Sequence, residues 1–98
     1  MEAFVPALSD PDGRVRAEAV AALGRLGARS LAGRLAAALS DRDHGVRAAA
    51  ATALSRLDGA GRLLLQHAMR GADRFAADAA RGALGLPPGQ PEPAKSDG

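Results

Sequence analysis

The chain has 98 residues, a formal net charge of +2 and no cysteine. This length suits one domain, and the lack of cysteine excludes disulfides and thiolate metal sites. The net charge is too small to indicate nucleic-acid binding by itself. The N-terminus does not resemble a signal peptide, and no stretch approaches the roughly 18 apolar residues of a membrane helix. We therefore expect a cytoplasmic protein that makes no membrane contact.

Alanine accounts for 25 of the residues, and twelve arginines stand against one lysine. Both residue types favour helices, and the bias is also typical of a GC-rich bacterial genome. Phe4 and Phe75 are the only aromatic residues. The composition predicts helices that approach one another closely over alanine and bury a modest area per residue.

The strongest signal is an internal repeat. Residues 7–27 and 38–58 are identical at thirteen of twenty-one positions, at a fixed offset of 31. A repeat of this length is typical of one supersecondary unit stacked on copies of itself.

In chain order, the N-terminal residues Phe4, Val5 and Leu8 form the end of an apolar stripe. Asp10 is then expected to cap a helix near residues 11–26, with Pro11 in its first position and Asp12 near its positive end. The apolar face expected for this helix follows helical spacing. It consists of Val15, Ala19, Ala22, Leu23 and Leu26.

The second unit begins with a shorter helix capped by Ser30, whose apolar stripe is Leu31, Leu35, Ala38 and Leu39. Asp41 and Asp43 repeat the start signal without the proline, and the next helix is expected near residues 42–57. Its apolar face is Val46, Ala50, Ala53, Leu54 and Leu57. Gly27 and Asp58-Gly59 mark the repeat ends.

A third, degraded unit follows at a spacing of about 30 instead of 31. Its first helix holds Leu64, Leu65, Ala68 and Met69, and Asp73 is expected to cap a second helix with Ala76, Ala80 and Leu84 on its inner face. Pro87-Pro88 stops that helix. We expect a repeat domain over residues 1–86, divided into 1–27, 28–58 and 59–86, and a flexible tail over 87–98.

The repeat segments resemble bacterial HEAT repeats of the HEAT-like or phycobilisome-lyase-like type. In the first copy the resemblance rests on Leu8, Asp10, Asp12, Val15, Arg16, Ala19, Leu23 and Leu26. In the second copy it rests on Leu39, Asp41, Asp43, Val46, Arg47, Ala50, Leu54 and Leu57. It covers about residues 2–86 and implies an all-α fold, a short α-solenoid of about three helix pairs in a right-handed superhelix.

The resemblance also implies that Asp10, Arg16, Asp41 and Arg47 form a structural ladder that links neighbouring repeats. An arginine in the first turn of a helix has the reach to contact loop carbonyls and a neighbour's aspartate.

For function, we expect a non-enzymatic module that binds a protein partner of unknown identity. Solenoids usually bind on their concave surface, and the pattern places five residues there as candidate partner contacts. They are Arg14, Glu18, Arg25, Thr52 and Arg56. Two alternatives follow from the resemblance: an accessory subunit of an enzyme, similar to phycobilin-lyase proteins, and a weak nucleic-acid-binding module, similar to HEAT-type alkylpurine glycosylases.

Catalytic, cofactor and metal sites are not expected. HEAT proteins that resemble deoxyhypusine hydroxylase carry His-Glu directly after the repeat's arginine, but here those positions read Ala17-Glu18 and Ala48-Ala49. His44 and His67 lie in different kinds of position, and no nucleophile motif or phosphate loop is present.

Register equates Met1 with Ala32, so the first helix lacks the stretch that would match Ser30-Leu31. We therefore expect a truncated N-terminal unit that leaves Phe4 and Val5 near an open end. Such an end favours self-association or further upstream repeats, because terminal repeats normally need a polar outer face.

Overall fold

The computed structural model describes residues 2–87. Five α-helices form this part of the chain: α1 (Gly13–Arg25), α2 (Ala32–Ala37), α3 (His44–Ser55), α4 (Asp58–Arg70) and α5 (Arg74–Ala83). Short 3-10 helices cover Glu2–Phe4, Pro6–Ser9, Arg29–Leu31 and Ala38–Ser40. Residues 2–87 contain no strand, so the predicted all-α fold is confirmed. None of the helices described is both long and apolar enough to cross a bilayer.

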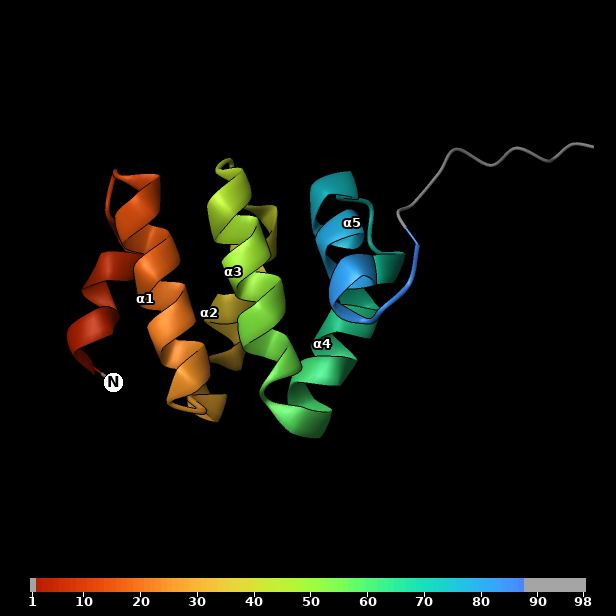
Figure 1. The fold of residues 1–98 in the computed structure, drawn as a ribbon, viewed down its shortest axis with the longest axis horizontal. Coiled ribbons are helices and arrows are strands. Elements are labelled where there is room, and N and C mark those ends of the chain that lie inside the picture. Colours follow the sequence, from red (N-terminus) through yellow and green to blue (C-terminus); the bar gives the residue numbers. More distant parts are fainter. Residues whose placement is uncertain (1, 88–98) are drawn as a thin grey trace, which may run out of the picture.

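The helices form two layers (Figure 1). α1, α3 and α5 make one layer, and α2 and α4 make the other. α3 is the central element, because it packs against α1, α2, α4 and α5. This arrangement of stacked helix pairs is what the sequence repeat predicts.

An aspartate is the N-cap of each of the helices α1, α3 and α5. In α1 this cap lies two residues later than expected. Asp12, not Asp10, is the N-cap of α1, and its carboxylate accepts a hydrogen bond from the N–H of Arg14 at 2.9 Å. Asp10 instead accepts from the N–H of Asp12 at 2.8 Å. The prediction of Asp10 as the cap was wrong because the chain carries two aspartates one residue apart, and the first is used in the turn that precedes the helix.

The ends of the same helices use a left-handed residue. Gly27 has φ 67°, Asp58 has φ 56° and Gly85 has φ 78°. After α1 the N–H of Ala28 reaches back to the carbonyl of Leu23 at 3.1 Å, a bond of the Schellman type. The predicted punctuation at Gly27 and Asp58 therefore has a direct backbone cause.

The first helix of each early unit is shorter than expected. At the N-terminus two 3-10 helices stand where the end of a helix was predicted. Ser30 lies in a 3-10 turn and caps nothing: α2 begins at Ala32 without a side-chain cap. Three-residue 3-10 turns often replace the ends of helices where no cap satisfies the backbone donors.

The core is a run of leucines and valines surrounded by alanine. Its largest fully buried side chains are Leu23, Leu35, Leu39, Leu54, Leu57, Leu65, Val20 and Val46. Two glycines allow the helices to approach closely. A methyl group at Gly24 would lie 2.6 Å from the Cβ of Ala53 on α3, and one at Gly61 would overlap the carbonyl oxygen of Leu54.

Two residues predicted for the apolar face of the first repeat are not buried. Val15 is 37% exposed and Leu26 is 55% exposed, whereas their counterparts Val46 and Leu57 are each 1% exposed. The second copy lies between two neighbours, but the first has a full neighbour on one side only. The periodicity was right for the helix and wrong for the burial of these two side chains.

The third unit follows its prediction more closely. Asp73 caps α5 by accepting from the N–H groups of Phe75 and Ala76 at 2.9 and 3.1 Å. Ala76 and Ala80 are buried, and Leu84 is partly buried against the core. The residues predicted for the preceding helix lie in α4. The predicted flexible tail falls, from residue 88 onward, outside the described residues.

Candidate functional site: the face formed by α1, α3 and α5

Arg16 clamps the first sequence repeat to the second. Its Nε and NH2 groups donate to the two carboxylate oxygens of Asp41, both at 2.9 Å. Its NH1 group donates to the carbonyls of Asp10 and Pro11 at 2.7 and 3.0 Å. Arg16 is only 6% exposed. Paired in this bidentate way, a buried guanidinium fixes the distance between two loops.

The Asp41 carboxylate is also hydrogen-bonded within its own turn. One of its carboxylate oxygens also accepts from the N–H of Asp43 at 2.8 Å, and Asp43 in turn caps α3. The hydrogen bond from Arg16 is the main reason that the pKa of the Asp41 carboxyl lies below its ordinary value. Because the folded pKa is lowered, Asp41 stabilises the fold fully above its unfolded pKa, and this contribution is lost as the pH falls through the folded pKa.

We predict that Asp41→Asn lowers the free energy of unfolding by about 1.5 kcal/mol at pH 7, because charge-assisted hydrogen bonds are replaced by weaker ones. The difference between wild type and variant should shrink as the pH falls below about 4, where the unfolded aspartate of the wild type becomes protonated. Urea unfolding at several pH values measures it.

Asp58→Asn is the matched control, because Asp58 pairs with Arg29 at 2.6 Å with both side chains largely exposed. Exposed ion pairs contribute little, and asparagine tolerates the left-handed backbone of this position. An Asp41→Asn cost that stays constant between pH 7 and pH 3 would contradict the role given to the Asp41 carboxylate.

Arg47 occupies the same position in the second repeat but has different neighbours. Its NH1 group donates to the carbonyl of Asp41 at 2.8 Å, as the NH1 group of Arg16 does to Asp10. Its guanidinium carbon lies 4.6 Å from the centre of the Phe75 ring on α5. Arg47 therefore joins α3 to α5 through a cation–π contact instead of an ion pair.

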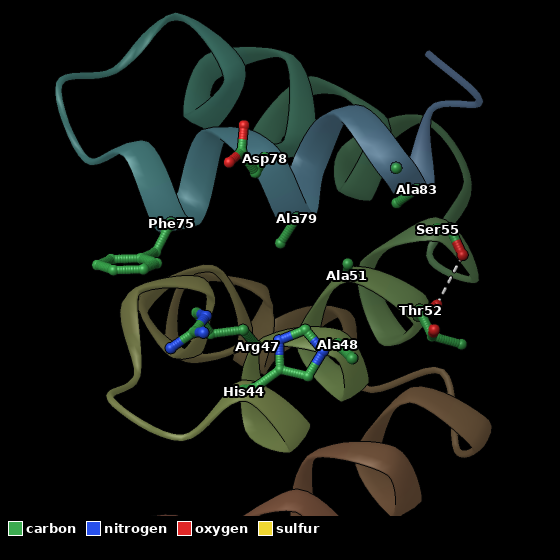
Figure 2. A pocket seen from close by; sticks show the side chains of 11 residues that line it. His44, Arg47, Ala48, Ala51, Thr52, Ser55, Phe75, Asp78, Ala79 and Ala83 are labelled. Carbon is green, nitrogen blue, oxygen red and sulfur yellow. Dashed lines mark hydrogen bonds between the residues drawn. The ribbon is translucent and has the colours of Figure 1, made fainter. Parts of the chain in front are cut away.

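A groove of about 460 Å³ runs between α3 and α5. Figure 2 shows side chains of α3 along one side and side chains of α5 along the other. Alanine and glycine supply five of the eleven lining residues, and the charged ones include Arg47 and Asp78. The lining residues are His44, Arg47, Ala48, Ala51, Thr52, Ser55, Phe75, Asp78, Ala79, Gly82 and Ala83.

A second, smaller groove of about 310 Å³ lies between α1 and α3. It brings together three of the predicted partner contacts, Arg25, Thr52 and Arg56. Thr52 borders both grooves. The other two candidates, Arg14 and Glu18, are exposed on α1 outside either groove lining.

Sequence reasoning missed the groove between α3 and α5. Phe75 stands where the earlier repeats have Arg14 and Gly45, but this is visible only when the third unit is aligned at an offset of 30. The aspartate caps at positions 12, 43 and 73 supply that alignment. Arg47 was assigned to the structural ladder alone, and its place beside an aromatic ring was not foreseen.

The histidines do not come together. His44 lines the groove between α3 and α5, and His67 is exposed on α4. Over residues 2–87, no three histidine, aspartate or glutamate side chains gather in a way that could hold a metal ion. This face offers groups for noncovalent binding: guanidinium groups, one aromatic ring and small apolar side chains.

A search of curated proteins and a search of solved structures gave no significant match. A family model for HEAT repeats matches residues 1–85. That match covers most of the chain and the whole set of stacked helices described above, so the chain belongs to the HEAT-repeat family.

Proposed function

We propose that this chain is a non-enzymatic protein-interaction module that binds its partner on the face formed by α1, α3 and α5. HEAT repeats generally serve as scaffolds for protein–protein interaction, and members of the family are typically not catalytic. The observation that carries the proposal is the pair of adjoining grooves on this face, which share Thr52.

The face presents exposed side chains on a backbone that buried contacts hold in place. Arg16 and the aspartate caps hold the loops at one end of the layer, and the helices approach closely at Gly24. Arg25 and Arg56 are exposed and border the groove between α1 and α3. A partner pays little ordering cost on such a surface, because the backbone that carries the contacts is already fixed.

The partner contacts assigned to this face are Arg14, Glu18, Arg25, Thr52 and Arg56. Three helices of 10 to 13 residues offer a small surface, so a complex formed by this domain alone should be weak or transient.

Selection of a random peptide library on the immobilised full chain tests the proposal. Selected peptides should perturb amide resonances of α1, α3 and α5 in the nuclear magnetic resonance spectrum. The double variant Arg25→Glu/Arg56→Glu should weaken binding at least about tenfold, by charge reversal next to the ligand. It should leave the melting temperature nearly unchanged, since exposed charges contribute little to stability.

The matched control is Arg16→Ala, which removes a buried clamp from the same arginine-rich chain. It should lower the melting temperature. Failure to select any peptide, or resonance changes confined to α2 and α4, would contradict the proposal. Binding of a DNA duplex with a steep salt dependence would instead support the nucleic-acid alternative.

A further inference from the structure

Three equivalent turns precede α1, α3 and α5, and the residue that carries a carboxylate in the first two is a glycine in the third. The residues at the turns are Asp10, Asp41 and Gly71, with φ, ψ of −63°, 141°, of −61°, 147° and of −76°, 172°. In each turn the N–H donates to the carbonyl three residues earlier, at 3.2, 3.1 and 3.0 Å. The backbone of Gly71 thus repeats the backbone of Asp41, but no carboxylate projects from it.

The guanidinium groups of Arg16 and Arg47 contact the turns before their own helices in the same way. Arg16 and Arg47 each fix NH1 on a carbonyl of the turn before their own helix, at 2.7 and 2.8 Å. Arg16 then gives its Nε and NH2 edge to Asp41 in the next turn. By the repeat register, Gly71 is the counterpart of Asp41, the residue that this edge contacts in Arg16. Three ion pairs form within residues 2–87, and Arg47 belongs to none of them.

Asp73 is close enough for its charge to interact with Arg47, but the two side chains form no ion pair. One carboxylate oxygen of Asp73 caps α5 through two backbone N–H groups. Phe75 covers a face of the Arg47 guanidinium and is itself 64% exposed. Within residues 2–87, Arg47 therefore forms no ion pair like the one between Arg16 and Asp41, and it lines the groove between α3 and α5.

We propose that this groove binds a segment of a partner protein that places one aspartate or glutamate side chain on the Nε and NH2 edge of Arg47, as Asp41 lies on Arg16. The proposal rests on the proposed function and specifies the chemistry of the partner. Bidentate guanidinium–carboxylate pairs are among the stronger hydrogen-bonded contacts in proteins, and Arg16 shows that this chain forms one.

The rest of the groove restricts the segment further. Ala48, Ala51 and Ala79 leave room for small or medium apolar side chains beside the Phe75 ring. Asp78 is the one carboxylate among the lining residues described, and it points away from Arg47 in Figure 2. A second acidic residue near Asp78 would be repelled, so a single acid at the Arg47 end fits the charges of the groove.

The test uses the full chain and the peptide library of the preceding section. Selected peptides should share one aspartate or glutamate at a fixed position. Changing that acid to its amide should weaken binding about ten- to a hundredfold, the range expected for a charge-assisted hydrogen-bond pair. Arg47→Gln should cause a similar loss, and Asp78→Asn should strengthen binding. The Nε–H resonance of Arg47 should shift on titration.

Gly71→Asp is the decisive variant, because it leaves Arg47 in place. A Cβ at Gly71 would lie 3.4 Å from the nearest atom, the carbonyl oxygen of Ala68, which is an ordinary contact distance. The new carboxylate should pair with Arg47 inside the chain, raise the melting temperature and weaken peptide binding at least about tenfold. Gly33→Asp adds the same charge on α2, where a Cβ meets nothing within 4 Å, and should leave binding unchanged.

Several results would overturn the inference. Selected peptides without a shared acid, or peptides that bind Gly71→Asp and Arg47→Gln as well as wild type, leave the proposed function standing and reject the role of Arg47. Tighter peptide binding after deletion of residues 88–98 would show that the chain's own tail occupies the groove. Failure to select any peptide would reject the proposed function itself.

Discussion

Leu54→Ala is expected to lower the free energy of unfolding by about 2–5 kcal/mol, because it removes a fully buried leucine and leaves a cavity. Leu54 lies on α3, which packs against four other α-helices. Surrounding atoms held from several sides collapse little into the space. A domain of this size has a total stability of the same order, so the melting temperature should fall by about 10 °C or more. Urea and thermal unfolding followed by circular dichroism measure both quantities.

Two other leucines make the comparison sharp. Leu23→Ala removes an equally buried side chain from α1, at the edge of the layer, and should cost less than Leu54→Ala. Leu26→Ala removes a leucine that is 55% exposed and should change stability little. Equal costs for Leu54→Ala and Leu23→Ala would contradict the central position assigned to α3.

Gly61→Ala is expected to destabilise the protein by about 3 kcal/mol, at the upper end of typical overpacking costs. The added methyl group would overlap the carbonyl oxygen of Leu54 and lie 3.0 Å from the Cβ of Leu57. A backbone carbonyl cannot rotate away, so α4 would have to move from α3. The gain in helix propensity, at most about 1 kcal/mol, does not compensate.

Gly59→Ala is the matched control on the same helix, because a Cβ there meets nothing within 4 Å. It should be neutral or stabilising by up to about 1 kcal/mol. If Gly61→Ala and Gly59→Ala had the same effect in urea unfolding, the close approach of α3 and α4 would not exist in solution.

Local signals predicted α1, α3 and the cap of α5 well. The repeated apolar spacing located α1 and α3 within two residues at each end, and Asp73 was identified as a cap although the third unit is degraded. These features depend on residues close in sequence, which is why one chain sufficed to find them.

Features that depend on the neighbouring unit were harder to predict. Periodicity could not distinguish the buried Val46 from the exposed Val15, since both lie on the same stripe. The groove between α3 and α5 was missed because Phe75 and Gly71 replace the expected residues just where the repeat spacing changes. Burial and binding surfaces arise from how units stack, and a repeat pattern alone describes one unit.

The different partners of Arg16 and Arg47 also affect how cooperatively the array of repeats unfolds. In a linear array, the coupling between adjacent units decides whether they melt together or one after another. The bidentate ion pair of Arg16 and Asp41 couples the first unit to the second, whereas the cation–π contact of Arg47 with Phe75 joins the second unit to the third. α4 and α5 should therefore open more often than α1 and α3, and amide exchange should be fastest at the C-terminal end of the described helices. A bound carboxylate on Arg47 would reduce this difference, so that the ligand acts as the missing coupling between the last two units.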